Sequence, residues 1–293
     1  MNVSVVTDSA ASLPAGAAER LGIVVVPMTL VLGGIVYADG DLAPSEVVAR
    51  VGRESVSTSA PSPGDFLKGL AAATEGEESG GQVVALTVSS SMSASYEVAH
   101  TAASYVDDAE VRVIDTRTAA GAQGLVVMAA AELARTGASL DAVTAKARQV
   151  AGQVRLMAAL SSLDYLARSG RVPGAAAWAG RSLGVRAMFE FAAGGVRPRR
   201  PARSDRGALD RMVGAMLQAR PADPGPGGAV LHAAVLEAQA PESAATLRAM
   251  VVEAVPAAVI FEAPFSSVMI AHTGPGLVGL AWWWEARDGG TAT

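Results

Sequence analysis

The 293-residue sequence predicts an α/β protein built from two lobes. In the first half, short β-branched runs alternate with helical segments, which is typical of a doubly wound parallel sheet. In the second half, tight turns join neighbouring strand segments, which indicates a mixed or antiparallel sheet with helices. Hydrophobic residues make up 51% of the chain, enough for a large core. We therefore predict lobes at residues 1–155 and 156–287, followed by a frayed tail at 288–293.

In the first half, glycine and proline residues mark the turns and helix starts between the expected strands and helices. Pro27 interrupts the second strand and suggests an edge position. Gly33 and Gly34 mark a turn, Pro44 begins a helix, and 55–64 is a loop with many hydroxyl groups. The expected strands are 3–6, 23–31, 35–37, 83–88 and 111–114, and the expected helices are 15–21, 44–53, 63–74, a segment ending near 105, 119–135 and 140–153.

Polar groups follow three of these strands directly, in clusters that begin with Thr7-Asp8, Ser89 and Asp115. In an open α/β sheet, ligands bind beyond the carboxyl ends of the strands. We therefore expect the three polar clusters to lie along one shared rim of the sheet.

The second half contains shorter segments with frequent glycine and proline. A basic return strand follows the expected Gly194-Gly195 turn, and a Pro/Gly loop spans 221–228. The expected strands are 155–161, 186–193, 196–203, 230–236, 258–263, 268–272 and 277–284, and the expected helices are 163–169, 175–183, 209–219 and 241–255.

Composition excludes several classes of function. The net charge of −5 and the pI of about 5.3 argue against a nucleic-acid-binding surface. The chain has no cysteine and only three histidines, far apart in sequence, so we expect no disulfide and no metal site. The first residues lack a basic region, and no apolar run reaches the ~18–20 residues of a membrane helix. We expect a cytoplasmic protein.

Two short motifs invite enzymatic interpretations. Residues 274–279 match G-x-G-x-x-G, but they precede an expected strand rather than a helix, so a dinucleotide site is disfavoured. A serine hydrolase would need a triad such as Ser93, His272 and Asp8. No G-x-S-x-G elbow is present, and nothing in the spacing requires this triad. A serine-dependent acyl hydrolase or another lipid-acting enzyme therefore stays as the alternative hypothesis.

Other candidate groups have both structural and functional interpretations. Two hydroxyl-rich loops, 58–62 and 89–93, can cap helices or bind an anionic group. His272 lies before a Gly-Pro-Gly turn and can hydrogen-bond an anionic head group or fill a structural role. The basic residues between Arg197 and Arg206 form a solvated face or dock an acidic partner.

Seven blocks, spread over about residues 3–284, resemble one known family. They are VTDSAASLP from Val6, VPMTLVLGGIVYADGDL from Val26, STSAPSPGDF from Ser57, VSSSMSASYEVA from Val88, VIDTRTAAGAQGLVV from Val113, LDYLARSGRV from Leu163 and HTGPGLVGLAW from His272. In this order they resemble the DegV family of bacterial fatty-acid-binding proteins, which includes the carrier subunits of fatty acid kinase called FakB.

The resemblance implies a non-enzymatic carrier that holds a long-chain fatty acid between its two lobes, such as palmitate, stearate or oleate. It implies no cofactor, a possible fatty acid kinase subunit as partner, and transient contact with a membrane surface. By motif position, the carboxylate-binding residues are Thr58, Ser59, Ser89, Ser90, Ser93, His272 and Thr273. Arg171 matches a head-group or interface residue, and Arg203 matches an arginine that docks the kinase. Independently of the family, Met92, Met128, Met188 and Phe189 are candidates for lining the acyl chain.

Several positions depart from the family pattern. The usual T-S-Q-P loop has Ala60 at its third position, and the usual S-G-T-Y reads Ser93-Ala94-Ser95-Tyr96. The usual G-G-R begins with Ser169, and a frequent K-P pair reads Arg186-Ala187. These changes spare the expected carboxylate ligands and affect head-group details and coupling to a kinase.

Overall fold

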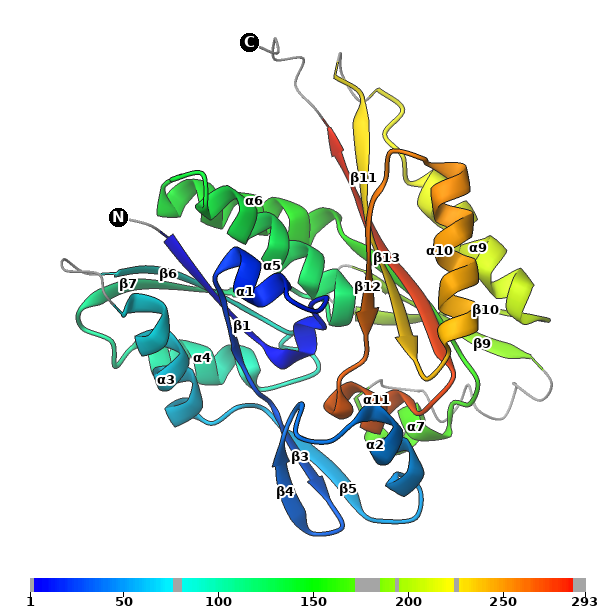
Figure 1. Cartoon of the computed structure of the whole chain (residues 1–293), viewed down its shortest axis with the longest axis horizontal. Helices are drawn as coiled ribbons and strands as arrows, with labels where there is room; N and C mark the ends of the chain where they lie inside the picture. Colours follow the sequence, from blue (N-terminus) through cyan, green and yellow to red (C-terminus); the bar gives the residue numbers. More distant parts are fainter. Residues whose placement is uncertain (1–2, 76–80, 172–184, 193–194, 224–226, 287–293) are drawn as a thin grey trace.

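Strands and helices of the computed structural model form three sheets with their covering helices (Figure 1). The structure describes residues 3–75, 81–171, 185–192, 195–223 and 227–286. The helix expected at 175–183 and the tail at 288–293 lie outside the described residues. The division of the chain near residue 155 stays a prediction.

The first sheet is parallel, with strand order β2-β1-β6-β7. Its strands are β1 (Val3–Asp8), β2 (Ile23–Val26), β6 (Gly81–Thr87) and β7 (Ala109–Asp115). The flanking helices are α1 (Ala17–Leu21), α3 (Pro63–Thr74), α4 (Ser95–Ala103), α5 (Ala120–Ala134) and α6 (Leu140–Gln153), with a 3₁₀ turn η1 (Ser9–Ala11) after β1. Helices α3 and α4 cover one face, and α5 and α6 cover the other (Figure 1). The predicted doubly wound sheet is confirmed, and its order reverses between β1 and β6.

The second sheet has the order β10-β9-β8-β13-β11-β12, in which only β11 and β12 are parallel. Its strands are β8 (Arg155–Leu160), β9 (Arg186–Ala192), β10 (Gly195–Ala202), β11 (Ala229–Ala238), β12 (Val259–Pro264) and β13 (Leu277–Ala286). Its helices are α7 (Asp164–Ser169), α9 (Asp205–Gln218) and α10 (Pro241–Ala254). Helices α9 and α10 pack on its outer face (Figure 1). The predicted mixed sheet is confirmed.

Helix α5 lies between the two large sheets and contacts both β1 and β11. Two glycines permit this close packing. A Cβ at Gly121 would lie 2.8 Å from the Cβ of Ala234, and one at Gly124 would lie 2.6 Å from the carbonyl oxygen of Ala11. Because α5 is buried on nearly all sides, its sequence is apolar all round rather than amphipathic.

A third, small antiparallel sheet contains the strand expected at 35–37 after the turn at Gly33 and Gly34, but its separation from the first sheet and its strand at 56–59 were not predicted. It has the order β4-β3-β5, formed by β3 (Thr29–Leu32), β4 (Ile35–Ala38) and β5 (Val56–Ser59), with α2 (Pro44–Arg50) nearby. The single strand expected at 23–31 was therefore wrong, because Pro27 cannot donate to a ladder and the chain changes sheets there. The loop expected at 55–64 was also partly wrong, since its first residues pair with β3.

The strand expected at 268–272 was wrong as well: helix α11 (Ser267–Thr273) occupies this segment. The Ser266 side chain accepts a hydrogen bond from the backbone N–H of Met269 and caps the helix. A short apolar run cannot be assigned to a strand or a buried helix from periodicity alone. His272 thus lies in the last turn of a helix.

Candidate ligand-binding site

The polar groups at the ends of β1, β6 and β7 share one rim, as predicted. The backbone N–H of Val88 donates to Oδ2 of Asp8 over 2.9 Å, which joins the end of β1 to the end of β6. The hydroxyl of Ser90 donates to Oδ2 of Asp115 over 2.6 Å, which joins the same loop to β7. The serine-rich loop after β6 is therefore anchored on both neighbouring strands.

Asp8 is fully buried beneath this loop. Its Oδ1 also accepts from the backbone N–H of Ala10 at 3.2 Å and from Nε2 of Gln123 at 3.0 Å. Burial raises the pKa of Asp8 to about 6, against the opposing effect of the hydrogen bonds from Gln123, Val88, Ala10 and Ser95. A carboxyl group of this kind titrates close to neutral pH.

The second half of the site comes from β5 and α11. Oγ1 of Thr58 lies 2.7 Å from Nε2 of His272. Burial lowers the pKa of His272 to about 4, and the positive charge of Arg171 adds to this effect. The imidazole is therefore neutral at physiological pH.

Arg171, just after α7, completes this group. Its Nη2 lies 3.4 Å from the carbonyl oxygen and 3.5 Å from Oγ1 of Thr58, and its Nη1 donates to the carbonyl of Ser169 over 2.9 Å. Among the described residues, its hydrogen-bond partners are oxygens of neutral groups. The guanidinium therefore retains a net positive charge that suits an anionic ligand.

These groups border a cavity of about 300 Å³ between the serine-rich loop and α11. Five of the predicted site residues line it: Thr58, Ser59, Ser93, Arg171 and His272. The other lining residues are mainly apolar: Ala10, Met28, Ala60, Val88, Met92, Ala94, Ala119, Val268 and Met269. The cavity thus combines apolar walls with a polar end, an arrangement typical of sites for amphiphilic ligands.

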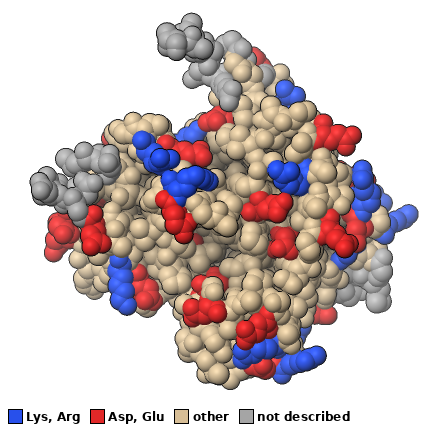
Figure 2. Space-filling model, in the orientation of Figure 1, with Lys and Arg blue, Asp and Glu red and all other residues tan. Residues whose placement is uncertain are grey.

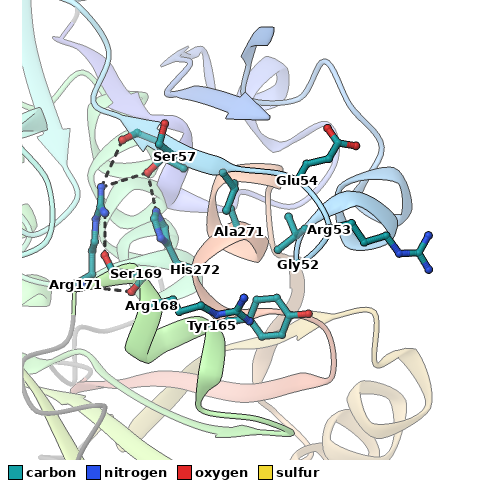
Figure 3. Close-up of a pocket in the computed structure, with 13 residues that line it drawn as sticks. Gly52, Arg53, Glu54, Ser57, Tyr165, Arg168, Ser169, Arg171, Ala271 and His272 are labelled. Carbon is teal, nitrogen blue, oxygen red and sulfur yellow. Dashed lines mark hydrogen bonds between the residues drawn. The ribbon is translucent and has the colours of Figure 1, made fainter. Parts of the chain in front are cut away.

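A second cavity, of about 360 Å³, lies on the other side of the same polar group (Figure 3). It shares Thr58, Arg171 and His272 with the first cavity and is otherwise lined by residues of β5, α7 and the α2–β5 connection and by Ala271 of α11. In Figure 3, the Arg171 side chain extends toward β5 beside His272. Its Nη2 lies 3.4 Å from the carbonyl oxygen of Thr58 on that strand. The polar group therefore lies between a mainly apolar cavity and one whose lining includes the charged residues Arg53, Glu54 and Arg168.

Three predicted ligands do not line either cavity. The Ser89 hydroxyl lies 2.9 Å from that of Ser91, and Ser90 donates to Asp115. Thr273 donates to the carbonyl of Met269 over 3.0 Å, within its own helix. Each hydroxyl thus has a partner that stabilises a loop or a helix end.

The four residues expected to line an acyl chain lie in different parts of the structure. Met92 lines the first cavity, whereas Met128 lines a different cavity beside Trp283. Met188 and Phe189 are neighbours on β9 and point to opposite faces of the sheet. Met188 packs in the cluster beneath α9 and α10, and Phe189 faces the cluster that contains α5, so neither residue lines the first cavity.

The enzymatic alternatives gain no geometric support from the described residues. His272 meets Thr58, Ser93 meets Ser95, and Asp8 holds backbone groups and Gln123, so the triad is not assembled. Residues 274–279 lead into β13, which excludes a dinucleotide loop there. Within the described ranges, no cluster of His, Cys, Asp or Glu could hold a metal ion.

The sequence did not predict the second cavity. It also did not predict that buried polar side chains support the serine-rich loop from below. Arg53, Tyr165 and Arg168 line the second cavity. Arg53 lies outside the seven blocks, whereas Tyr165 and Arg168 lie in the block that begins at Leu163, where only Arg171 was singled out. Gln123 was also missed. Its polar side chain in an otherwise apolar helix was the available signal, because a buried amide needs a partner.

Comparison with known proteins identifies the family. A family model described as an uncharacterised protein of the DegV family matches residues 2–285. A DegV domain-containing protein from Streptomyces coelicolor is 35% identical over 283 residues, covering 95% of this chain and 97% of the relative. This chain belongs to the DegV family.

Two solved DegV structures are also similar to this chain. A DegV family protein from Thermus thermophilus, described as binding fatty acid, has a TM-score of 0.87 and 29% identity, covering 97% of this chain and 99% of its own. DegV from Bacillus subtilis, described as a fatty acid binding protein, has a TM-score of 0.83 and 25% identity, covering 97% and 100%. The DegV fold of two α/β lobes is therefore established for this chain, and these two relatives are fatty-acid-binding proteins.

Proposed function

We propose that this DegV protein is a non-enzymatic carrier that binds a long-chain fatty acid, with the carboxylate at the polar end of the first cavity. One observation carries the proposal. Thr58, Ser93 and His272 come from three separate segments and converge on one cavity whose other walls are mainly apolar. The fatty-acid-binding descriptions of the Thermus thermophilus and Bacillus subtilis relatives support the same ligand class.

The hydrogen-bonding capacity of the polar end suits a carboxylate. Arg171 can only donate, and its Nη2 approaches Oγ1 of Thr58. When the neutral imidazole of His272 carries its proton on Nε2, it also donates to Thr58. The Thr58 hydroxyl proton is then free to donate to the ligand carboxylate, and the Ser93 hydroxyl supplies a second donor.

The remaining predicted ligands take different roles. Ser59 lines the cavity and adds a hydroxyl at its rim. Ser89, Ser90 and Thr273 act indirectly, by holding the serine-rich loop and the end of α11 in place. A buried carboxylate with unmet hydrogen bonds costs several kcal/mol, so the polar end orients the ligand.

The acyl chain supplies most of the affinity. Burial of a methylene group is worth about 0.8 kcal/mol, so a sixteen-carbon tail offers roughly 12 kcal/mol before costs. Association costs of at least about 4 kcal/mol reduce this figure. The balance favours palmitate, stearate or oleate over short acids, since each lost methylene lowers the affinity.

A carrier must also release its cargo. We propose that the ligand carboxylate faces the second cavity and is presented there to a partner, an acyl kinase, in the cytoplasm. Arg203 lies exposed between β10 and α9 and is the proposed docking residue. Loading occurs by transient contact with a membrane surface, and no helix within the described residues is long and apolar enough to cross a membrane.

Organic extraction of the purified protein, followed by mass spectrometry, tests the ligand class. We expect free long-chain fatty acid at close to one equivalent per chain, either as purified or after incubation with a fatty acid panel. The Thr58→Val protein, purified in parallel, should retain less. Absence of any acyl species after loading would refute the proposal.

A further inference from the structure

Asp39 lies immediately after β4 and joins two segments that are distant in the chain. Its Oδ2 accepts from the hydroxyl of Ser9 in η1 over 2.6 Å, and its Oδ1 accepts from the backbone N–H of Val268 in α11 over 3.1 Å. A carboxylate suits this position, because it has two acceptor oxygens and a charge that strengthens both hydrogen bonds. One side chain therefore holds η1 and α11 together.

The same group also holds the connection between β2 and β3. The backbone N–H of Met28 donates to Oγ of Ser9 over 3.0 Å. The backbone N–H of Asp39 donates to the carbonyl of Met28 over 2.8 Å. Met28 is thus bonded once to Ser9 and once to Asp39 itself, so a third segment is tied to the same carboxylate.

Each of these three segments contributes an apolar residue to the first cavity. Ala10 follows Ser9 in η1, Met28 belongs to the β2–β3 connection, and Val268 belongs to α11, and all three line the cavity. Protein interiors are closely packed, so the spacing of backbone segments decides the space that is left between their side chains. The position of this part of the cavity wall therefore depends on Asp39.

We propose that Asp39 is a positioning residue that sets the width of the first cavity at this wall, and that it makes the cavity select unbranched over branched acyl chains. The inference rests on the proposed function, because it concerns the tail of a bound fatty acid. A branched tail collides with a wall that Asp39 holds in place, whereas an unbranched tail fits beside it. Selectivity is the difference between the two affinities, so a wall that can move reduces it.

Competition binding with palmitate and phytanate tests the inference. Phytanate has the same sixteen-carbon main chain with methyl branches along it, so the two acids share a carboxylate and differ in the width of the tail. In Asp39→Ala we expect the ratio of palmitate affinity to phytanate affinity to fall at least about fivefold. A smaller folded fraction lowers both apparent affinities by the same factor, so a purely structural effect leaves this ratio unchanged.

Asp41→Ala is the matched control. Asp41 is the next acidic residue in the same β4–α2 connection, and its Oδ2 accepts from the backbone N–H of Ala38 over 2.7 Å. Because this hydrogen bond closes the turn after β4 and involves none of the three wall segments, the ratio should stay within about twofold of that of the unmodified protein.

Ser9→Ala gives a second, independent measurement. It removes the hydroxyl that donates to Asp39 and the acceptor for the backbone N–H of Met28, so it should shift the ratio in the same direction as Asp39→Ala. In both variants the Ser267 hydroxyl still donates to the carbonyl of Leu42 over 2.8 Å, which keeps α11 attached to the β4–α2 connection. If Asp39→Ala does not fold, the ratio in Ser9→Ala decides.

The outcomes distinguish this inference from the proposed function. An unchanged ratio in Asp39→Ala or Ser9→Ala, or an equal shift in Asp41→Ala, would overturn the role of Asp39 and leave the carrier function intact. Failure of both acids to bind the unmodified protein would instead refute the carrier function.

Discussion

Oγ1 of Thr58 on β5 lies 2.7 Å from Nε2 of His272 on α11, although the residues are 214 positions apart in the chain. This contact joins the small sheet β4-β3-β5, near the start of the chain, to helix α11, which precedes the last strand of the chain, β13 (Figure 1). The pair therefore depends on the correct packing of both halves. It is also the group on which the two cavities meet.

Thr58→Val removes one hydroxyl and keeps the shape of the side chain. We expect palmitate affinity to fall about tenfold to a hundredfold, because a buried polar partner left unsatisfied costs about 1–3 kcal/mol. Fluorescence competition measures this loss. Thr246→Val is the control, since the Thr246 hydroxyl bonds only to the carbonyl of Glu242 on the exposed side of α10. Equal losses in the two variants would contradict a specific role for Thr58.

His272 makes stability sensitive to acid. Its pKa is about 4 in the folded protein but about 6.5 when unfolded, so between these values the unfolded chain binds more protons. Acidification from pH 7 to pH 5 therefore destabilises the fold, by up to about 2 kcal/mol from this residue. His272→Gln should lose correspondingly less stability over the same range. Urea unfolding at both pH values measures the difference within each protein.

Asp8 has the opposite effect on how stability depends on pH. Its pKa is raised from 3.8 to about 6, so the folded protein binds more protons than the unfolded chain between these values. Its contribution to stability is therefore most favourable below about pH 4 and diminishes as the pH rises to 6. Because both proteins keep Asp8, it cancels in the comparison with His272→Gln. An identical acid response in the two proteins would contradict a neutral buried imidazole.

Met92→Trp and Met128→Trp test which cavity holds the acyl chain. Met92 lines the cavity at Thr58, and Met128 lines the one at Trp283. A tryptophan at Met92 should fill space that the ligand needs and lower palmitate affinity by at least about tenfold. The same change at Met128 should alter affinity less than about twofold. The reverse order would place the acyl chain beside Trp283.

Gly274 permits the sharp turn that ends α11 and fixes the position of His272. Its φ is +69°, and a Cβ there would collide with the ring of Tyr165 on α7. Gly137 has a φ of +80° with nothing near the Cβ position, which makes it the control for a positive φ without a steric neighbour. Gly137→Ala should cost about 1–2 kcal/mol and Gly274→Ala about 2–4 kcal/mol, because overpacking adds to strain. Urea unfolding measures both, and equal costs would contradict the steric role of Tyr165.

Arg203→Glu tests the docking proposal. Acidic and basic side chains are interspersed over the face drawn in Figure 2. Arg203 is exposed, so its charge is accessible to an acidic partner. Charge reversal should weaken binding to an acyl kinase by at least about thirtyfold while leaving palmitate affinity unchanged. Arg135→Glu, on the other lobe, is the control. Loss of palmitate binding in Arg203→Glu would show a structural effect instead.

Local patterns predicted most strands of the two large sheets. The run Val3–Val6 and the run Val83–Val88 are apolar because both faces of a parallel sheet are covered, which leaves a clear signal in the sequence. The shared rim of Asp8, Ser89 and Asp115 was predicted because the carboxyl ends of parallel strands lie at one edge of the sheet. The strand expected at 268–272 was wrong because a run of only four apolar residues before His272 packs equally well as a strand or as a buried helix.

By itself, the sequence determined the α/β class, the family and the residue types of the polar end, since composition, alternation and motif order are properties of the chain alone. Only the tertiary structure decided which of those residues meet. Thr58, Ser93 and His272 converge on one cavity, whereas Ser89, Ser90 and Thr273 find partners elsewhere. The physical reason is that hydroxyl direction and strand pairing depend on neighbours distant in sequence, and no local pattern encodes those neighbours.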